Sequence, residues 1–326
     1  MESSYWSSEV IFETRGLIGG CAIGDMDAAV PGNEIVAVCR SGEIHMIYRS
    51  ESDWKSKLIF SSPGEMIQCT IGDVDPDLPG RELVAVGIAS GYEESGGLGA
   101  AYLVYRDRDA WKGEKIFDDE SLLHGVCIGD GGVFVTGYSR KAHLLKKNGR
   151  QWIAEKVADL PGAGKAAVQT PKGVLFASTD GSLIRVNRSE SGWSSEVVDK
   201  RDSGRARLGA QDDRIIVSDD DGTLSIVGTV RREEIYSERS ELRGAVLCDL
   251  DPSCPGMEAA TAGYQKKVTV LYRQNNAWNP RTLYYDTGMF HHLVAGDLDG
   301  LPGMELAACG YSGRLVILRC CSEHRQ

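Results

Sequence analysis

The chain has 326 residues, a net charge of −11 and a pI near 5.1. This acidic balance argues against nucleic acid as a partner, because phosphates require a basic face, and no apolar run approaches the roughly 20 residues of a membrane span. The first ten residues, MESSYWSSEV, lack the basic and apolar regions of a secretory signal. We therefore expect neither a nucleic-acid partner nor a membrane, and the length suffices for one large core.

One pattern occurs seven times along the chain. An apolar run ending in Gly-Asp is followed by a turn, a second apolar run, another turn and a third run, first as GCAIGDMDAAVPGNEIVAVCRSGEIHMIY and last as HHLVAGDLDGLPGMELAACGYSGRLVIL. The Gly-Asp position and its equivalents are Asp25, Asp73, Asp130, Pro171, Asp212, Asp249 and Asp297. Their spacing runs from 37 residues (Asp212 to Asp249) to 57 (Asp73 to Asp130), close to the roughly 40–50 residues of a four-stranded propeller blade.

A fourth run led by tryptophan follows most copies. These tryptophans are Trp54, Trp111, Trp152, Trp193 and Trp278, whereas Trp6 precedes the first copy. The runs are short and rich in Val, Ile, Tyr and Leu, which predicts strands rather than helices. We expect the Trp6 run to complete the last blade and close the ring, which removes the exposed edges of an open array.

The sequence thus predicts an all-β, seven-bladed β-propeller of four-stranded antiparallel blades, forming a single domain over residues 1–326. The predicted blades span about 17–61, 66–118, 123–159, 164–199, 205–238, 242–285, and 290–320 together with 5–13. The nine cysteines show neither a disulfide framework nor a CxxC pattern. This usage is typical of a reducing compartment, so we expect a cytoplasmic protein.

Acidic turns follow the first run in blades 1, 2, 6 and 7. Their candidate ligands are Asp25, Asp27, Asp73, Asp75, Asp249, Asp251, Asp297 and Asp299. Alternating carboxylates can bind calcium, a hard cation that takes six to eight oxygen ligands. Alternatively, the carboxylates accept hydrogen bonds from backbone amides of their own turns.

The opposite end of each blade carries different residues. Blade connectivity places the starts of the innermost strands and the turns between second and third strands on one face, at a mouth of the central channel. The strand starts offer His124, Lys165, Arg205, Arg243, His291 and His292, and the turns offer Arg40, Tyr138, Tyr264 and Tyr311. Clustered cations favour an anionic or polyhydroxylated ligand. Histidines from opposite blades favour a shared divalent metal such as zinc or an acid–base pair, while solvated histidines and simply packed tyrosines are the alternative.

The Gly-Asp-x-Asp turns resemble the FG-GAP/VCBS class of propeller repeats, although a Pro-Gly-x-Glu turn replaces that class's compact calcium loop. The segments LLHGVCIGD (122–130) and FHHLVAGDLDG (290–300) are similar to the propeller domain of aldos-2-ulose dehydratase and its bacterial relatives. That resemblance implies a channel metal supporting water elimination from a keto-sugar. It implies His124, His291 and His292 as metal ligands, and Tyr138 and Tyr311 as acid–base or hydroxyl contacts.

Three functional hypotheses remain open. The first is a metal-assisted sugar lyase, dehydratase or hydratase with His124, His291, Tyr138 and Tyr311 as catalytic residues. The second is a non-catalytic propeller that binds a glycan or small anion through Lys165, Arg205, Arg243, Tyr264 and Arg40. The third is a scaffold for a protein partner. Fold alone does not choose among them.

Overall fold

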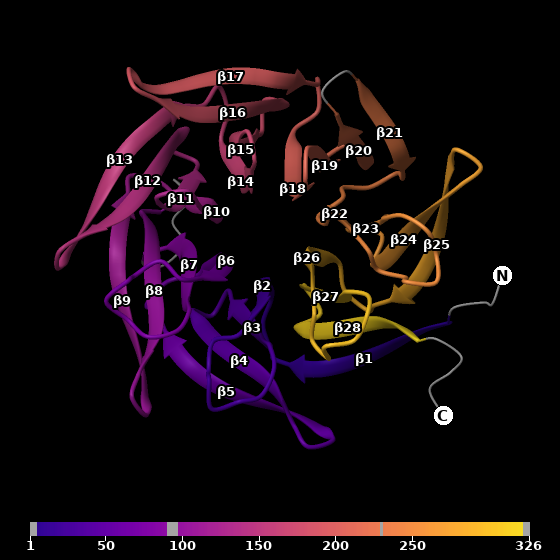
Figure 1. Cartoon of the computed structure of the whole chain (residues 1–326), viewed down its shortest axis with the longest axis horizontal. Helices are drawn as coiled ribbons and strands as arrows, with labels where there is room; N and C mark the ends of the chain where they lie inside the picture. The colour runs from indigo at the N-terminus through magenta and orange to yellow at the C-terminus, as the bar shows by residue number, and fades with distance from the viewer. Residues whose placement is uncertain (1–4, 90–96, 229–230, 322–326) are drawn as a thin grey trace.

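The computed structural model describes residues 5–89, 97–228 and 231–321. Seven four-stranded antiparallel sheets surround a central axis (Figure 1). The described residues contain no helix, and so none that could cross a membrane. The predicted seven-bladed β-propeller is confirmed.

In six sheets the strands run outward from the axis in chain order, and in the seventh β26, β27 and β28 are followed by β1. The innermost strands are β2 (Ile18–Gly24), β6 (Met66–Gly72), β10 (Leu123–Gly129), β14 (Gly164–Thr170), β18 (Arg205–Gln211), β22 (Val246–Cys248) and β26 (Phe290–Gly296). The second strands are β3 (Glu34–Cys39), β7 (Glu82–Ile88), β11 (Gly132–Gly137), β15 (Gly173–Ser178), β19 (Arg214–Asp219), β23 (Glu258–Ala262) and β27 (Glu305–Gly310).

The outer half of each sheet is built the same way. The third strands are β4 (Glu43–Ser50), β8 (Gly99–Asp107), β12 (Lys141–Asn148), β16 (Ser182–Ser189), β20 (Thr223–Val227), β24 (Lys267–Gln274) and β28 (Arg314–Cys321). The outermost strands are β5 (Asp53–Ser61), β9 (Ala110–Asp119), β13 (Gln151–Asp159), β17 (Gly192–Lys200), β21 (Arg232–Ser237), β25 (Ala277–Tyr285) and β1 (Tyr5–Glu13).

The first and last strands of the chain close the ring. Strand β1 pairs antiparallel with β28, where Ser8 lies opposite Leu318 and Phe12 opposite Leu315; the two strands lie side by side in Figure 1. The indole Nε1 of Trp6 also donates to the Tyr272 hydroxyl of the sixth blade at 2.7 Å. The expected closure by the Trp6 run is therefore confirmed.

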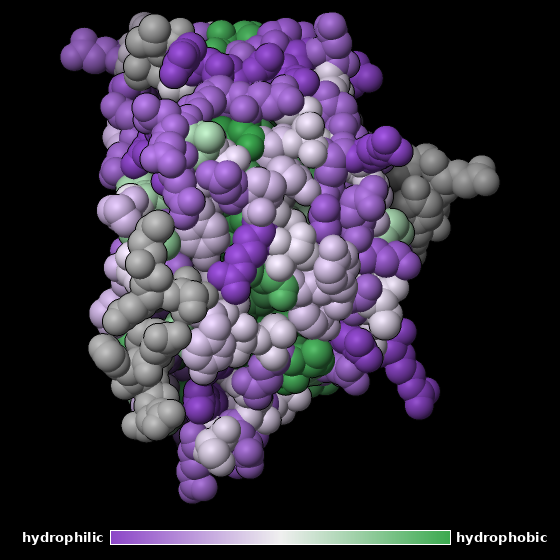
Figure 2. Space-filling model, turned by 90° about the vertical axis from the view of Figure 1, so that its right-hand side faces the viewer, coloured by the Kyte–Doolittle hydropathy of each residue, from purple (hydrophilic) through white to green (hydrophobic). Residues whose placement is uncertain are grey.

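The core consists of layers between neighbouring blades, because both faces of a radial sheet meet another sheet. In one layer, Val36 and Val38 of blade 1 belong to the same buried cluster as Leu83 and Ala85 of blade 2. From the side, hydrophilic residues cover much of the ring, and hydrophobic residues show only in small separate areas (Figure 2). The core is thus distributed around the ring, which leaves the channel wall to the innermost strands.

Candidate ligand site in the channel

A β-bulge near the start of the innermost strand recurs in six blades. In each, one residue is skipped in the pairing with the second strand; the skipped residues are Gly19, Ile67, His124, Lys165, Ala206 and His291. A bulge re-aims the side chain of its extra residue. These are the positions that the repeat predicts at the channel wall, so His124, Lys165 and His291 enter the channel at the same level of their blades.

His124, Lys165 and His291 together border a cavity of about 190 Å³, which we call the vestibule. It is lined by Arg40, Leu122, His124, Tyr138, Lys165, Ala206, Arg207, Asp220, Arg243, Tyr264, His291 and Tyr311. Most of the residues predicted at the channel mouth therefore meet in one place. Two of them, Arg205 and His292, do not line the vestibule, whereas Arg207, which flanks the predicted wall position Ala206 but was not chosen as a ligand residue, does.

His124 and His291 lie with their ring centroids 6.2 Å apart. The Nδ1 atom of His124 is 2.9 Å from the Lys165 carbonyl oxygen, and that of His291 is 2.6 Å from the Gly19 carbonyl oxygen. A carbonyl oxygen only accepts, so Nδ1 carries the proton in both rings and Nε2 is left as an acceptor. Burial, reinforced by nearby cations such as Arg207, lowers the pKa of both histidines well below its usual value. Both imidazoles are therefore neutral acceptors.

The four cations of the vestibule differ in their partners. Arg40 pairs with Glu65 at 2.7 Å and Arg243 with Asp220 at 2.6 Å. Lys165 instead donates to the Tyr138 hydroxyl at 2.5 Å, and its Nζ lies 4.7 Å from the centre of that ring. Within the described part of the chain, Lys165 and Arg207 have no ion pair with a carboxylate.

Arg207 is the most constrained of these cations. Its side chain is 4% exposed, its Nη1 and Nη2 donate to the carbonyl oxygens of Ala206 and His291, and its Nε lacks a hydrogen-bond partner. Burial first, and then the charge of Arg243, lower its pKa to about 9. A buried charge without a counter-charge is costly, so an anion in the vestibule would be stabilised beside it.

Arg205, predicted to bind the ligand, serves the fold instead. Its side chain is fully buried, and Nη1 contacts both carboxylate oxygens of Asp219, at 2.9 and 3.0 Å, while Nη2 pairs with Asp199. The skipped residue Ala206 lies between the two arginines, and Ala206 and Arg207 line the vestibule whereas Arg205 does not. The two aspartates that pair with Arg205 were the signal in the sequence that this arginine stabilises the fold rather than binds a ligand.

The tyrosines form the outer part of the vestibule. The hydroxyls of Tyr264 and Tyr311 are 3.3 Å apart, and Arg243 lies 4.8 Å from the centre of the Tyr264 ring. Burial first, and then the hydrogen bond with Tyr264, raise the pKa of Tyr311 to about 12. Tyr138 and Tyr311 are 42% and 41% exposed, so their rings are open to a ligand.

His292 faces a different part of the channel. Its Nδ1 accepts the Cys21 amide hydrogen at 3.2 Å, and its Nε2 lies 3.3 Å from the side-chain amide of Gln68. In the described residues, the only close group of three metal-binding side chains is Asp297, Asp299 and Glu305. The predicted three-histidine set is not assembled, and the surrounding cations disfavour a divalent ion, so the vestibule does not fit a tetrahedral zinc site.

The acidic turns use their carboxylates within the fold. Oε2 of Glu34 accepts the Met26 and Asp27 amides at 2.7 and 3.3 Å, and Glu82, Glu258 and Glu305 act alike in their blades. Oδ1 of Asp27, Asp75, Asp251, Asp297 and Asp299 also accepts amides two residues ahead. Asp25, Asp73 and Asp249 are exposed. The contacts follow the structural alternative for these turns, and calcium in them stays a prediction.

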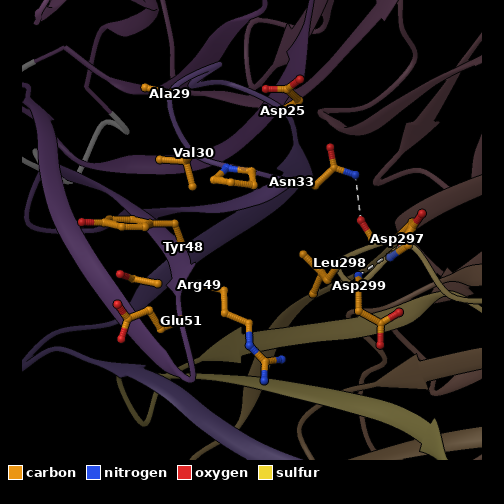
Figure 3. A pocket seen from close by; sticks show the side chains of 14 residues that line it. Asp25, Ala29, Val30, Asn33, Tyr48, Arg49, Glu51, Asp297, Leu298 and Asp299 are labelled. Carbon is orange, nitrogen blue, oxygen red and sulfur yellow. Dashed lines mark hydrogen bonds between the residues drawn. The ribbon is translucent and has the colours of Figure 1, made fainter.

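Another cavity, of about 870 Å³, is a groove between the first and seventh blades (Figure 3). Asn33 crosses this seam to donate to the Asp297 carbonyl oxygen at 2.7 Å. At the next seam, Arg106 pairs with Asp27 of the preceding blade, whereas the equivalent Arg49 is exposed at the groove. Because none of the residues that line it is buried, the groove is a weaker candidate than the vestibule.

The ring and its channel define the class of the protein as a seven-bladed β-propeller. Neither family profiles nor curated proteins match the sequence. Among solved structures, the WD40 β-propeller domain of Doa1 is similar with a TM-score of 0.69 and 13% identity, over 99% of this chain and 98% of that one. At this identity the similarity supports the fold alone. The FG-GAP/VCBS repeat type and the similarity to aldos-2-ulose dehydratase are not confirmed.

Proposed function

We propose that the vestibule binds a small hydroxylated carboxylate of the sugar-acid class. The observation that carries the proposal is Arg207, a buried cation without a carboxylate partner beside two imidazoles that can only accept hydrogen bonds at Nε2. The ligand carboxylate pairs with Arg207, and its hydroxyls donate to His124 and His291. The volume of about 190 Å³ equals about six water molecules at roughly 30 Å³ each, which fits a short hydroxy acid.

Calorimetric titration with glycerate and with glycerol tests this proposal, because the two differ only in the carboxylate. We expect glycerate to bind and glycerol to bind at least tenfold more weakly, since an ionic hydrogen bond is worth about 1.5–3 kcal/mol. R207Q should lose this preference. R40Q is the control, because Arg40 is already paired with Glu65.

The titration of Arg207 adds a second signature. Only the protonated guanidinium pairs with the anion, so affinity should be constant below pH 8 and fall once pH passes about 9. Equal binding of glycerate and glycerol, or an R207Q variant that binds glycerate as the wild type does, would overturn the proposal.

A second candidate is water elimination from a keto-sugar, favoured by the neutral His124 and its neighbour Tyr138, whose rings are 6.4 Å apart. Nε2 of His124 takes the proton α to the carbonyl, a carbon–carbon double bond forms, and the β-hydroxyl leaves as water with a proton from Tyr138. An unsaturated ketone absorbing in the ultraviolet is the expected product. H124N should abolish its formation, and a wild-type protein that yields none excludes this candidate.

A further inference from the structure

The channel continues past Arg207 into a second cavity of about 430 Å³, which we call the inner chamber. It lies along the later residues of the innermost strands, towards the acidic turns, around the axis seen in Figure 1. Its side chains are mostly apolar and come from several blades, among them Val126, Val168, Leu208, Val246 and Leu293. These side chains also pack in the layers between blades, and polar and apolar atoms contribute almost equally to the surface of the cavity. A volume of this size with apolar side chains and convergent polar groups is typical of a small-molecule site.

Gln68 supplies a polar group to this wall, with its side chain 8% exposed. His292 Nδ1 accepts the Cys21 amide hydrogen, so the ring proton is on Nε2. The structure places Gln68 Nε2 opposite this donor and leaves Gln68 Oε1 without a partner; two donors cannot share a hydrogen bond, so we assign the amide the reverse way, with its oxygen accepting from His292 Nε2. The amide NH2 is then the half of Gln68 without a protein partner, and it needs an acceptor. The lining contains no Asp or Glu, and Arg207 is its one charged residue, so the field in the chamber favours an anionic acceptor.

We propose that the inner chamber is a second ligand site, for a hydrophobic monocarboxylate such as a medium-chain fatty acid. The alkyl chain covers the apolar wall and displaces water, which is favourable in proportion to the area buried. The carboxylate accepts from the Gln68 amide in the field of Arg207. This ligand differs from the vestibule ligand because it is apolar and does not use His124 or His291.

Titration with straight-chain carboxylates from acetate to octanoate tests the proposal. Affinity should rise about fourfold with each added methylene until the chamber is full. A210F, which fills the chamber, and Q211W, which narrows it, should remove this increase. Q68L should weaken octanoate about tenfold and octanol less, because a neutral hydroxyl is a weaker acceptor than a carboxylate.

The vestibule variant H124N separates this site from the proposed function, and thermal melting verifies that each variant is folded. H124N should bind octanoate as the wild type does. Affinity that does not depend on chain length, or folded A210F and Q211W variants that both keep the dependence, would overturn the chamber site without affecting the glycerate result. Loss of glycerate binding alone would overturn only the vestibule.

Discussion

Each long acidic turn buries one glutamate whose charge the fold tolerates poorly. Glu34 and Glu258 are at most 2% exposed, and burial, which outweighs the amide hydrogen bonds that they accept, raises the pKa of each to about 7. The Oε1 atom of Glu34 has no hydrogen-bond partner. A protonated glutamate, or a glutamine, therefore satisfies this turn better than a carboxylate does.

These raised pKa values predict that stability depends on pH. The native state binds these two protons more tightly than the unfolded state, whose glutamates have a pKa near 4.5. The stabilisation of the native state by the bound protons is therefore complete below pH 4.5 and is lost as pH rises through about 7. The side-chain oxygen of a glutamine can still accept the backbone amide hydrogens, but the side chain carries no charge. We expect the double variant E34Q/E258Q to match the wild type at pH 5 and to be more stable at pH 8 by on the order of 1 kcal/mol per site.

Urea unfolding at pH 5, 6, 7 and 8 measures this difference. The control is E51Q, at the exposed Glu51. The free energy of unfolding of this variant should differ from that of the wild type by the same amount at every pH. A difference between the double variant and the wild type that is the same at every pH would contradict the prediction.

At the scale of elements, the repeated bulge explains which parts of the site could be predicted. The repeat locates the start of every innermost strand, so it could place His124, Lys165 and His291 at one level of the channel. It could not decide between adjacent residues, because a bulge changes the alternation of side chains between the faces of a strand. That is why Arg205 was predicted in place of Arg207, and why His292 was grouped with a histidine from which it points away.

The outermost strands are joined by a hydrogen bond that the tryptophan pattern alone did not predict. The indole Nε1 of Trp193 donates to Glu155 of the preceding blade at 2.7 Å, and Trp54, Trp152 and Trp278 make the same bond to Glu9, Glu114 and Glu233. Two tryptophans differ: Trp6 donates to Tyr272 instead, and Nε1 of Trp111 has no hydrogen-bond partner. The seams between blades therefore carry polar as well as apolar contacts.

Glu155 and Glu196 allow this bond to be measured separately. Both pair with a cation on the third strand of their own blade, Glu155 with Lys146 at 3.0 Å and Glu196 with Arg185 at 2.9 Å. Only Glu155 also accepts from a tryptophan, because the fifth blade has none. E155A should therefore cost about 0.5–1 kcal/mol more in the free energy of unfolding than E196A. Equal losses in urea unfolding would show that the indole bond contributes nothing measurable.

For the whole molecule, the number of blades and the closure of the ring could be predicted because they depend on the period of the repeat rather than on particular residues. The similarity to a WD40 propeller at 13% identity illustrates the same point. A channel ligand depends on a few side chains that differ from blade to blade, such as His124 in the third and Arg207 in the fifth. The period locates the start of each innermost strand but does not decide which of the neighbouring residues there, such as Arg205 and Arg207, faces the axis.

Ring closure leads to a prediction for the whole molecule. Deleting residues 1–13 removes β1 and exposes the edge of β28. It also removes the hydrogen bonds that Trp6 donates to Tyr272 and that Trp54 donates to Glu9. Since an unpaired edge leaves a row of backbone groups unsatisfied, we expect the melting temperature to fall by on the order of 10 °C, several kcal/mol of stability. W6F, which loses only the indole bond, should cost about 1 kcal/mol.

A peptide of residues 5–13 added back to the truncated chain distinguishes lost closure from general damage. The peptide should occupy the edge of β28 as an added strand and raise the melting temperature with a saturable dependence on its concentration, whereas a scrambled peptide of the same composition should not. A truncated chain that melts at the temperature of the full chain would mean that the β1–β28 pair does not hold the ring together. Its stability would then come from the apolar layers between the other strands, which lose Trp6, Ile11 and Phe12 when β1 is removed.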